Sequence, residues 1–272
     1  MLRERLLSAA ILAPPVIAAA IVGGVWTIIA VMIVFGLSIV EYTHLVARRG
    51  HRASAGLMLL WALLFCINQA YAELDLLGPL IAGGLIVSMA WMLVRYKQGT
   101  ANAFTGLAMT ITGAFYFGWS GSHLVGIRAL EDGAFWLIMV LITTWSTDAA
   151  AYFGGRALGR TPLLPEVSPN KTVEGYISGI VGGSIIAALL TYGGQMLGVG
   201  ESVTYQHTLI LSVLIGILTP IGDLGWSVLK RYTDAKDSSN LIPGHGGFLD
   251  RADTVYVSSV LVYYYLTFFV FT

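Results

Sequence analysis

The stretch VWTIIAVMIVFGLSIVEY, residues 25–42, contains no charged side chain before Glu41. As a helix it would extend about 27 Å, close to the roughly 30 Å thickness of the hydrocarbon core of a bilayer. An apolar run of this length is typical of a transmembrane helix and is too long for an ordinary buried strand. The run therefore predicts that this segment crosses a membrane.

Similar apolar runs occur along the whole chain. The predicted spans are 6–23, 25–42, 55–72, 77–95, 104–127, 134–155, 175–198, 207–229 and 253–271. We expect an all-α, polytopic integral membrane protein with about nine transmembrane helices. We expect residues 1–272 to form a single membrane domain. Its N-terminal spans would lie in 1–130, and its catalytic spans in 131–272, together with the loops 155–175 and 230–252.

The composition supports this reading. Hydrophobic residues make up 56% of the 272 residues and charged residues 11%, whereas soluble domains contain roughly 25% charged residues. The mean hydropathy is +0.76. The formal net charge is zero, so nothing favours a nucleic-acid partner. The single cysteine, Cys66, excludes an internal disulfide and a cysteine-built zinc site.

The distribution of basic residues predicts the orientation. With a cytoplasmic N-terminus, fourteen of the fifteen Lys and Arg residues fall on the cytoplasmic side, and Arg128 alone lies outside. Inverting the chain or removing one span destroys this partition. We therefore expect a cytoplasmic N-terminus, an external C-terminus, and cytoplasmic loops at 155–175 and 230–252.

Five carboxylates lie within predicted spans or at their ends, where ionisable groups are costly and often functional. They are Glu41, Asp148, Asp223, Asp250 and Asp253. Helical spacing places Asp223, Ser227 and Lys230 on one face, and Asp148 and Tyr152 on another. The alternative is that each carboxylate is a helix-end residue hydrogen-bonded at the membrane interface. For Asp250 or Asp253, that alternative would be a helix N-cap.

The first cytoplasmic loop contains SPNKTVEG at residues 168–175. Ser168, Lys171 and Thr172 precede a helix, and hydroxyls, an ammonium group and backbone N–H groups at such a position suit a phosphate. A plain loop with Thr172 as a capping residue is the competing interpretation. Gly175 begins a series of glycines at every fourth position, which indicates close helix packing.

The second loop reads SVLKRYTDAKDSSNLIPGHGGFLDRAD at residues 227–253. It combines cations that suit phosphates, carboxylates that suit magnesium, and glycines that let the backbone approach a ligand. This combination predicts metal-assisted handling of a polyphosphate at the inner membrane face.

This stretch resembles the signature of the CDP-diacylglycerol synthase family, also called phosphatidate cytidylyltransferases. The shared pattern is Ser, Lys-Arg, Lys-Asp, His-Gly-Gly, Asp-Arg and a final Asp. The segments 148–154 and 168–175 are similar to the family too, and in the expected order, and Arg5 also fits. Ala252 departs from the pattern, because the family usually has a larger apolar residue or Thr at this position.

The resemblance implies that CTP and phosphatidic acid are converted to CDP-diacylglycerol and pyrophosphate. It implies Mg²⁺ as cofactor, with a second cation that is magnesium or monovalent. The metal ligands would be Asp223 and Asp250, with Asp148 as further ligand or support. The catalytic residues would be Asp223, Lys230, His245, Asp250, Arg251 and Asp253. The residues that bind substrate would be Asp148, Tyr152, Ser168, Lys171, Thr172, Ser227, Arg231, Lys236, Gly246 and Gly247.

Two other functions remain as alternatives. A CTP-dependent lipid kinase would transfer the γ-phosphate and release CDP. An ion-coupled transporter would place its charged residues near the bilayer midplane. From the resemblance we expect a multi-pass protein of the bacterial inner membrane, with its active site facing the cytoplasm. The glycine-rich spans are compatible with a homodimer or with internal packing.

Overall fold

The computed structural model describes residues 2–200, 203–242 and 246–271. Over these residues the chain is helical except for one hairpin and short connections. The helices are α1 (Leu2–Val22), α2 (Val25–Ala47), α3 (Ala55–Ala70), α4 (Leu77–Lys97), α5 (Ala103–Gly113), α6 (Gly121–Ala129), α7 (Gly133–Leu158), α8 (Val173–Met196), α9 (Tyr205–Tyr232) and α10 (Leu249–Phe269). A 3₁₀ turn, η1 (Ala72–Leu74), follows α3, and a π-helix, η2 (Ala114–Ser120), joins α5 to α6.

Because α5, η2 and α6 follow one another without a break, the described residues form nine continuous helical segments. The expected all-α architecture is thus confirmed, and the number of helical segments matches the number of predicted spans. Within the described part of the chain, five helices are long and apolar enough to cross a membrane: α2, α4, α7, α8 and α9. α10 begins at Leu249, four residues before the predicted span, so Asp250 lies in its first turn.

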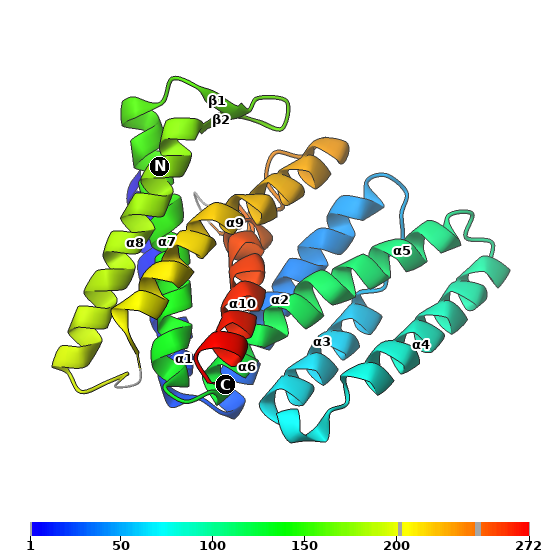
Figure 1. Cartoon of the computed structure of the whole chain (residues 1–272). Helices are drawn as coiled ribbons and strands as arrows, with labels where there is room; N and C mark the ends of the chain where they lie inside the picture. The colour runs from blue at the N-terminus through cyan, green and yellow to red at the C-terminus, as the bar shows by residue number, and fades with distance from the viewer. Residues whose placement is uncertain (1, 201–202, 243–245, 272) are drawn as a thin grey trace. The chain divides into compact units, whose positions relative to one another are not determined.

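The chain forms two compact units, which are described separately. The first comprises Met1–Ala129 and Lys230–Ala252. Its core is built around Phe35, Ile39 and Tyr42 of α2, all buried. Tyr42 contacts Phe117 of η2 edge-to-face and donates a hydrogen bond to the Met109 carbonyl. In this unit, α3 packs against η2 and α6, and α4 packs beside α5 (Figure 1).

The second unit comprises Leu130–Leu229 and Asp253–Thr272. Its main feature is the pair α7 and α8, which run side by side (Figure 1). A Cβ added at Gly179 would lie 3.0 Å from the Thr147 carbonyl oxygen and 3.1 Å from the Ala151 Cβ, and one added at Gly183 would overlap the Thr147 hydroxyl. The glycines at every fourth position therefore serve close packing between these two helices.

A hairpin occupies residues 162–172, within the predicted loop 155–175. Strand β1 (Pro162–Leu164) pairs antiparallel with β2 (Ser168–Thr172) before α8 begins (Figure 1). The Thr172 hydroxyl accepts a hydrogen bond from the Gly175 N–H at 3.1 Å and so caps α8. Glu174 accepts hydrogen bonds from the N–H groups of Arg160 and Thr161, which closes the hairpin onto the helix.

Candidate active site

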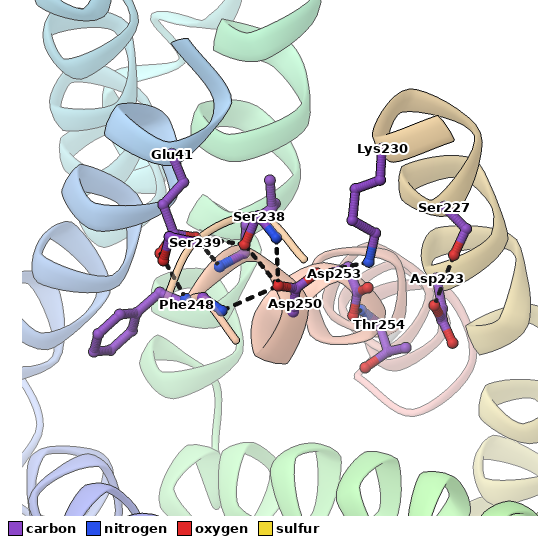
Figure 2. A network of polar contacts seen from close by, with 12 residues as sticks. Glu41, Asp223, Ser227, Lys230, Ser238, Ser239, Phe248, Asp250, Asp253 and Thr254 are labelled. Carbon is purple, nitrogen blue, oxygen red and sulfur yellow. Dashed lines mark hydrogen bonds and ion pairs between the residues drawn. The ribbon is translucent and has the colours of Figure 1, made fainter. Parts of the chain in front are cut away.

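The polar network of the first unit is centred on the Asp250 carboxylate. Its Oδ1 accepts a hydrogen bond from the Lys230 ammonium at 2.6 Å, and the two side chains are only 6% and 12% exposed. Its Oδ2 accepts from the Ser238 N–H at 2.8 Å, the Ser238 hydroxyl at 2.7 Å and the Gly247 N–H at 3.0 Å. Figure 2 shows these contacts converging from the end of α9, the loop and the start of α10.

The surroundings keep Asp250 ionised. Burial by itself raises the pKa of this carboxyl group, but the Lys230 charge and the hydrogen bonds from Lys230, Gly247 and Ser238 outweigh it. The net result is a pKa below the usual range. The site therefore holds a fixed ion pair of Lys230 with Asp250. The Lys230 ammonium group is a cation that suits a phosphate.

A second buried carboxylate, Glu41 of α2, holds the same loop. It is 2% exposed. Its Oε1 accepts from the Ser239 hydroxyl at 2.6 Å and the Phe248 N–H at 3.0 Å. Its Oε2 accepts from the Ser238 hydroxyl at 2.9 Å and the Leu249 N–H at 2.8 Å. Glu41 therefore fixes both sides of the loop and the beginning of α10 (Figure 2).

Ser238 links the two carboxylates. Its hydroxyl lies within hydrogen-bond distance of Glu41 Oε2 and of Asp250 Oδ2. A hydroxyl has one proton and can donate to one acceptor at a time. The backbone N–H of the same residue donates to Asp250 as well. Ser238 was not among the predicted site residues, although its place between Asp237 and Ser239 of the quoted motif was a signal for it.

The structure explains why glycine occupies positions 246 and 247 of the loop. Gly246 has φ +81°, in the left-handed region where side chains are unfavourable. A Cβ at Gly247 would overlap the Ser238 hydroxyl and the Glu41 carboxylate. The Gly247 position therefore admits no side chain while this network is formed. Whether these two residues also contact a substrate stays a prediction.

The second unit holds another polar cluster around Asp223 of α9. The Asp223 carboxylate forms an ion pair with Lys171 of β2, and these side chains are 32% and 27% exposed. It also accepts a hydrogen bond of 3.4 Å from the Ser227 hydroxyl, one helical turn further along, as the i, i+4 spacing predicted (Figure 2). Lys171 and Asp223, far apart in sequence, are thus brought together by the hairpin.

Asp148 and Asp253 belong to this unit too. Asp148 Oδ2 accepts a hydrogen bond from the Thr254 hydroxyl at 3.2 Å. Asp253 is 4% exposed, and its Oδ1 accepts from the Thr254 N–H at 2.8 Å. The Asp253 carbonyl lies so close to Gly222 that a Cβ there would be 2.5 Å away. Asp253 is therefore buried where α9 and α10 approach each other.

The remaining predicted residues lie as follows. The basic side chains Arg231, Lys236 and Arg251 are exposed, as is Tyr152 on the outer surface of α7, and Ser168 is half-buried at the start of β2. His245 lies outside the described residues. Within residues 2–200, 203–242 and 246–271, no three His, Cys, Asp or Glu side chains form a group that could hold a metal ion.

The donor set nonetheless fits magnesium in one respect. Mg²⁺ that accompanies a nucleotide is commonly bound by one or two carboxylates together with phosphates and water. Asp223 is a partly exposed carboxylate beside a hydroxyl, and both are hard oxygen donors. Its partner Lys171 shows that the position attracts a cation. Three donor groups already surround Asp250 Oδ2, so only Oδ1, which Lys230 contacts, could still coordinate a metal ion.

Comparison with known proteins places this chain in a family. Residues 3–269 match the family described as "Cytidylyltransferase family". A phosphatidate cytidylyltransferase of Brucella suis is 37% identical, over 96% of this chain and 92% of that protein. The phosphatidate cytidylyltransferase of Synechocystis is 32% identical, over 97% of this chain and 96% of that protein. The one of Bacillus subtilis is 33% identical, over 79% of this chain and 78% of that protein. From this match, which spans nearly the whole sequence, we conclude that the chain belongs to the cytidylyltransferase family.

Proposed function

We propose that this protein is a phosphatidate cytidylyltransferase, which joins CTP and phosphatidic acid to give CDP-diacylglycerol and pyrophosphate. The observation that carries the proposal is the segment 227–253. Its motif resembles the signature of that enzyme, and its Lys230 and Asp250 form a buried ion pair braced by Ser238 and Gly247. Relatives that carry this name cover almost the entire chain.

The reaction makes one bond and breaks one. A phosphate oxygen of phosphatidic acid attacks the α-phosphorus of CTP, and the bond from that phosphorus to the bridging oxygen of the β-phosphate breaks. Both electrons of that bond leave with pyrophosphate. Because the nucleophile is an anion, no general base is required. The protein has to align two anions and neutralise their charge.

We propose that Lys230 is the main residue that binds and aligns the phosphate groups. Asp250 holds its ammonium group in one place, so this cation is already positioned when a phosphate arrives. We assign the same role to Lys171 of the hairpin, because Asp223 holds its ammonium group in a defined position. The exposed residues Arg231, Lys236 and Arg251 are further candidates for the triphosphate and for the lipid phosphate.

We propose Asp223, with the Ser227 hydroxyl beside it, as the carboxylate that holds Mg²⁺. The bound ion would neutralise triphosphate charge and make pyrophosphate a better leaving group. Asp148 would support this unit, and a second cation, magnesium or monovalent, belongs to the same proposal. For Asp250, positioning Lys230 and the glycine loop is the role that its contacts favour over direct metal binding.

The protein is a membrane protein by the length and composition of its helices, and its named relatives are bacterial. We propose that it resides in the inner membrane with the loops 155–175 and 230–252 in the cytoplasm. The uneven distribution of basic residues supports this orientation. CTP would then reach the site from the cytosol and phosphatidic acid from the bilayer.

The test uses purified protein in mixed micelles with magnesium, phosphatidic acid, and CTP labelled at either the α- or the γ-phosphate. We expect the α-label in the lipid phase and the γ-label in pyrophosphate. Transfer of the γ-label to lipid would instead identify a CTP-dependent kinase. Absence of both, with ion-driven uptake into liposomes, would identify a transporter.

A further inference from the structure

A basic cavity of about 360 Å³ lies in the first unit, apart from the residues assigned above. It is formed where α2 ends, α3 begins and α4 ends. Its polar lining comes from Thr43, His51, Arg52, Ser54, Trp91 and Arg95. None of these lining side chains, all within the described part of the chain, is acidic. The cavity therefore concentrates positive charge with no carboxylate of its own to balance it.

Two nitrogen atoms in this lining have no hydrogen-bond partner among the described residues. Arg95 Nε and His51 Nδ1 are both buried without a hydrogen bond. The other His51 nitrogen, Nε2, lies 3.0 Å from the Tyr232 hydroxyl. Buried polar groups are nearly always paired. A cavity that contains such unpaired nitrogens and an arginine is suited to bind an anion.

The local backbone favours an anion as well. Ser54 is the N-cap of α3, and its hydroxyl accepts from the Leu57 N–H at 3.3 Å. The cavity thus lies at the positive end of a 16-residue helix. This feature adds to the arginines and would not define a site by itself. Together, guanidinium groups, an imidazole nitrogen and a helix N-terminus match the oxygens of a phosphate group.

The neighbouring surface indicates where such a phosphate comes from. On α4, just before Arg95, Met89, Leu93 and Val94 are exposed, and the apolar stretch of this helix is only 6% buried within the protein. A helix face of this kind contacts lipid tails. A lipid lying against α4 would bring its headgroup to the level of Arg95. The cavity therefore borders a helix whose exposed face suits lipid tails.

We propose that this cavity binds the phosphate group of an anionic membrane lipid. The proposal does not depend on the reaction assigned above. The cavity is nevertheless linked to the loop 230–252, here called the catalytic loop. His51 contacts the Tyr232 side chain, and Arg49 donates a hydrogen bond to the Tyr232 carbonyl at 2.5 Å. Tyr232 ends α9 two residues after Lys230. An occupant of the cavity would thus stabilise the end of the helix that carries Lys230.

The experiment measures binding directly. Full-length protein in neutral detergent is titrated with phosphatidylglycerol or phosphatidylcholine, and bound lipid is counted by native mass spectrometry. We expect the wild type to retain phosphatidylglycerol in preference to phosphatidylcholine. The Arg52→Gln/Arg95→Gln double variant should lose at least about tenfold in affinity for phosphatidylglycerol. Arg48→Gln, which removes an exposed arginine outside the cavity, is the matched control and should bind as the wild type does.

Two further measurements make the outcome decisive. Arg52→Gln alone changes an exposed residue and is not expected to disturb folding, so a weakened affinity in this variant supports the site even if the double variant is unstable. Inorganic phosphate added as competitor separates the sources: displacement of lipid by phosphate shows that the phosphate group alone is recognised. Equal retention of both lipids by the wild type, or unchanged affinity in both variants, would overturn the proposal.

Discussion

Replacing Glu41 by glutamine should loosen the catalytic loop while preserving the volume of the side chain. Each Glu41 oxygen accepts one backbone hydrogen bond and lies within hydrogen-bond distance of one serine hydroxyl. Glutamine keeps one of these oxygens and turns the other into an NH₂ group. The serine hydroxyl at that position can rotate and become an acceptor, but the backbone N–H of Phe248 or Leu249 cannot. One buried N–H therefore faces another donor.

The loss of stability comes from two changes in the buried network. A buried N–H without a partner costs about 1–3 kcal/mol, and the remaining hydrogen bonds lose the extra strength that a charged acceptor gives. We expect Glu41→Gln to destabilise the closed loop by about 3 kcal/mol. Since every 1.4 kcal/mol is a factor of ten, local opening should become about a hundredfold more frequent.

Hydrogen exchange followed by mass spectrometry is the assay. Amide exchange in residues 246–252 should accelerate strongly in Glu41→Gln, and cytidylyltransferase activity should fall because Lys230 and Asp250 lose their fixed loop. Glu73→Gln, at an exposed glutamate outside this network, is the matched control and should leave both unchanged. Wild-type exchange and activity in Glu41→Gln would refute the claim that this carboxylate positions the loop.

Three further predictions concern the site. Gly247→Ala should lower activity and thermal stability, because the added Cβ overlaps two partners; Gly78→Ala, with open space around it, should change neither in the same melting and activity assays. Asp250→Asn leaves the buried Lys230 charge uncompensated and should lower the free energy of unfolding by about 3–5 kcal/mol, whereas Lys230→Met/Asp250→Asn, which removes that charge and keeps an oxygen acceptor for the loop N–H groups, should be inactive yet melt above Asp250→Asn. Asp223→Asn should raise the magnesium concentration needed for half-maximal activity, and an unchanged requirement would remove Asp223 from the metal site.

Local patterns were sufficient for the helices. Apolar runs predicted the nine helical segments, since a helix of that length depends on the residues within it. The i, i+4 spacing of Asp223 and Ser227 likewise predicted their contact. The hairpin of residues 162–172 was missed, because such short strands have little periodicity of their own. The hairpin matters because it brings Lys171 to Asp223.

Long-range pairing explains what the sequence could not predict about the site. Glu41 is separated from Leu249 by 208 positions, and nothing near it in the chain indicates which donors it meets. Its isolation in an otherwise uncharged span was the available signal, and that signal identified the residue without its role. Ser238 was overlooked for the related reason that a serine in a polar loop is ordinary until its two carboxylate partners are known.

The contacts also distinguish Asp250 from Asp223, the two carboxylates that the resemblance assigned to the metal. The Asp250 side chain is almost fully buried, and three donor groups surround one of its oxygens. An incoming metal ion would have to compete with Lys230 for the other oxygen. Asp223 is partly exposed, with a hydroxyl and an exchangeable ammonium group as its partners. Releasing Lys171 would free both a metal ligand and a cation for phosphate in one exchange. On this reasoning, removal of magnesium should leave the loop around Asp250 intact by hydrogen exchange, and loop opening on chelation would assign that carboxylate to the metal instead.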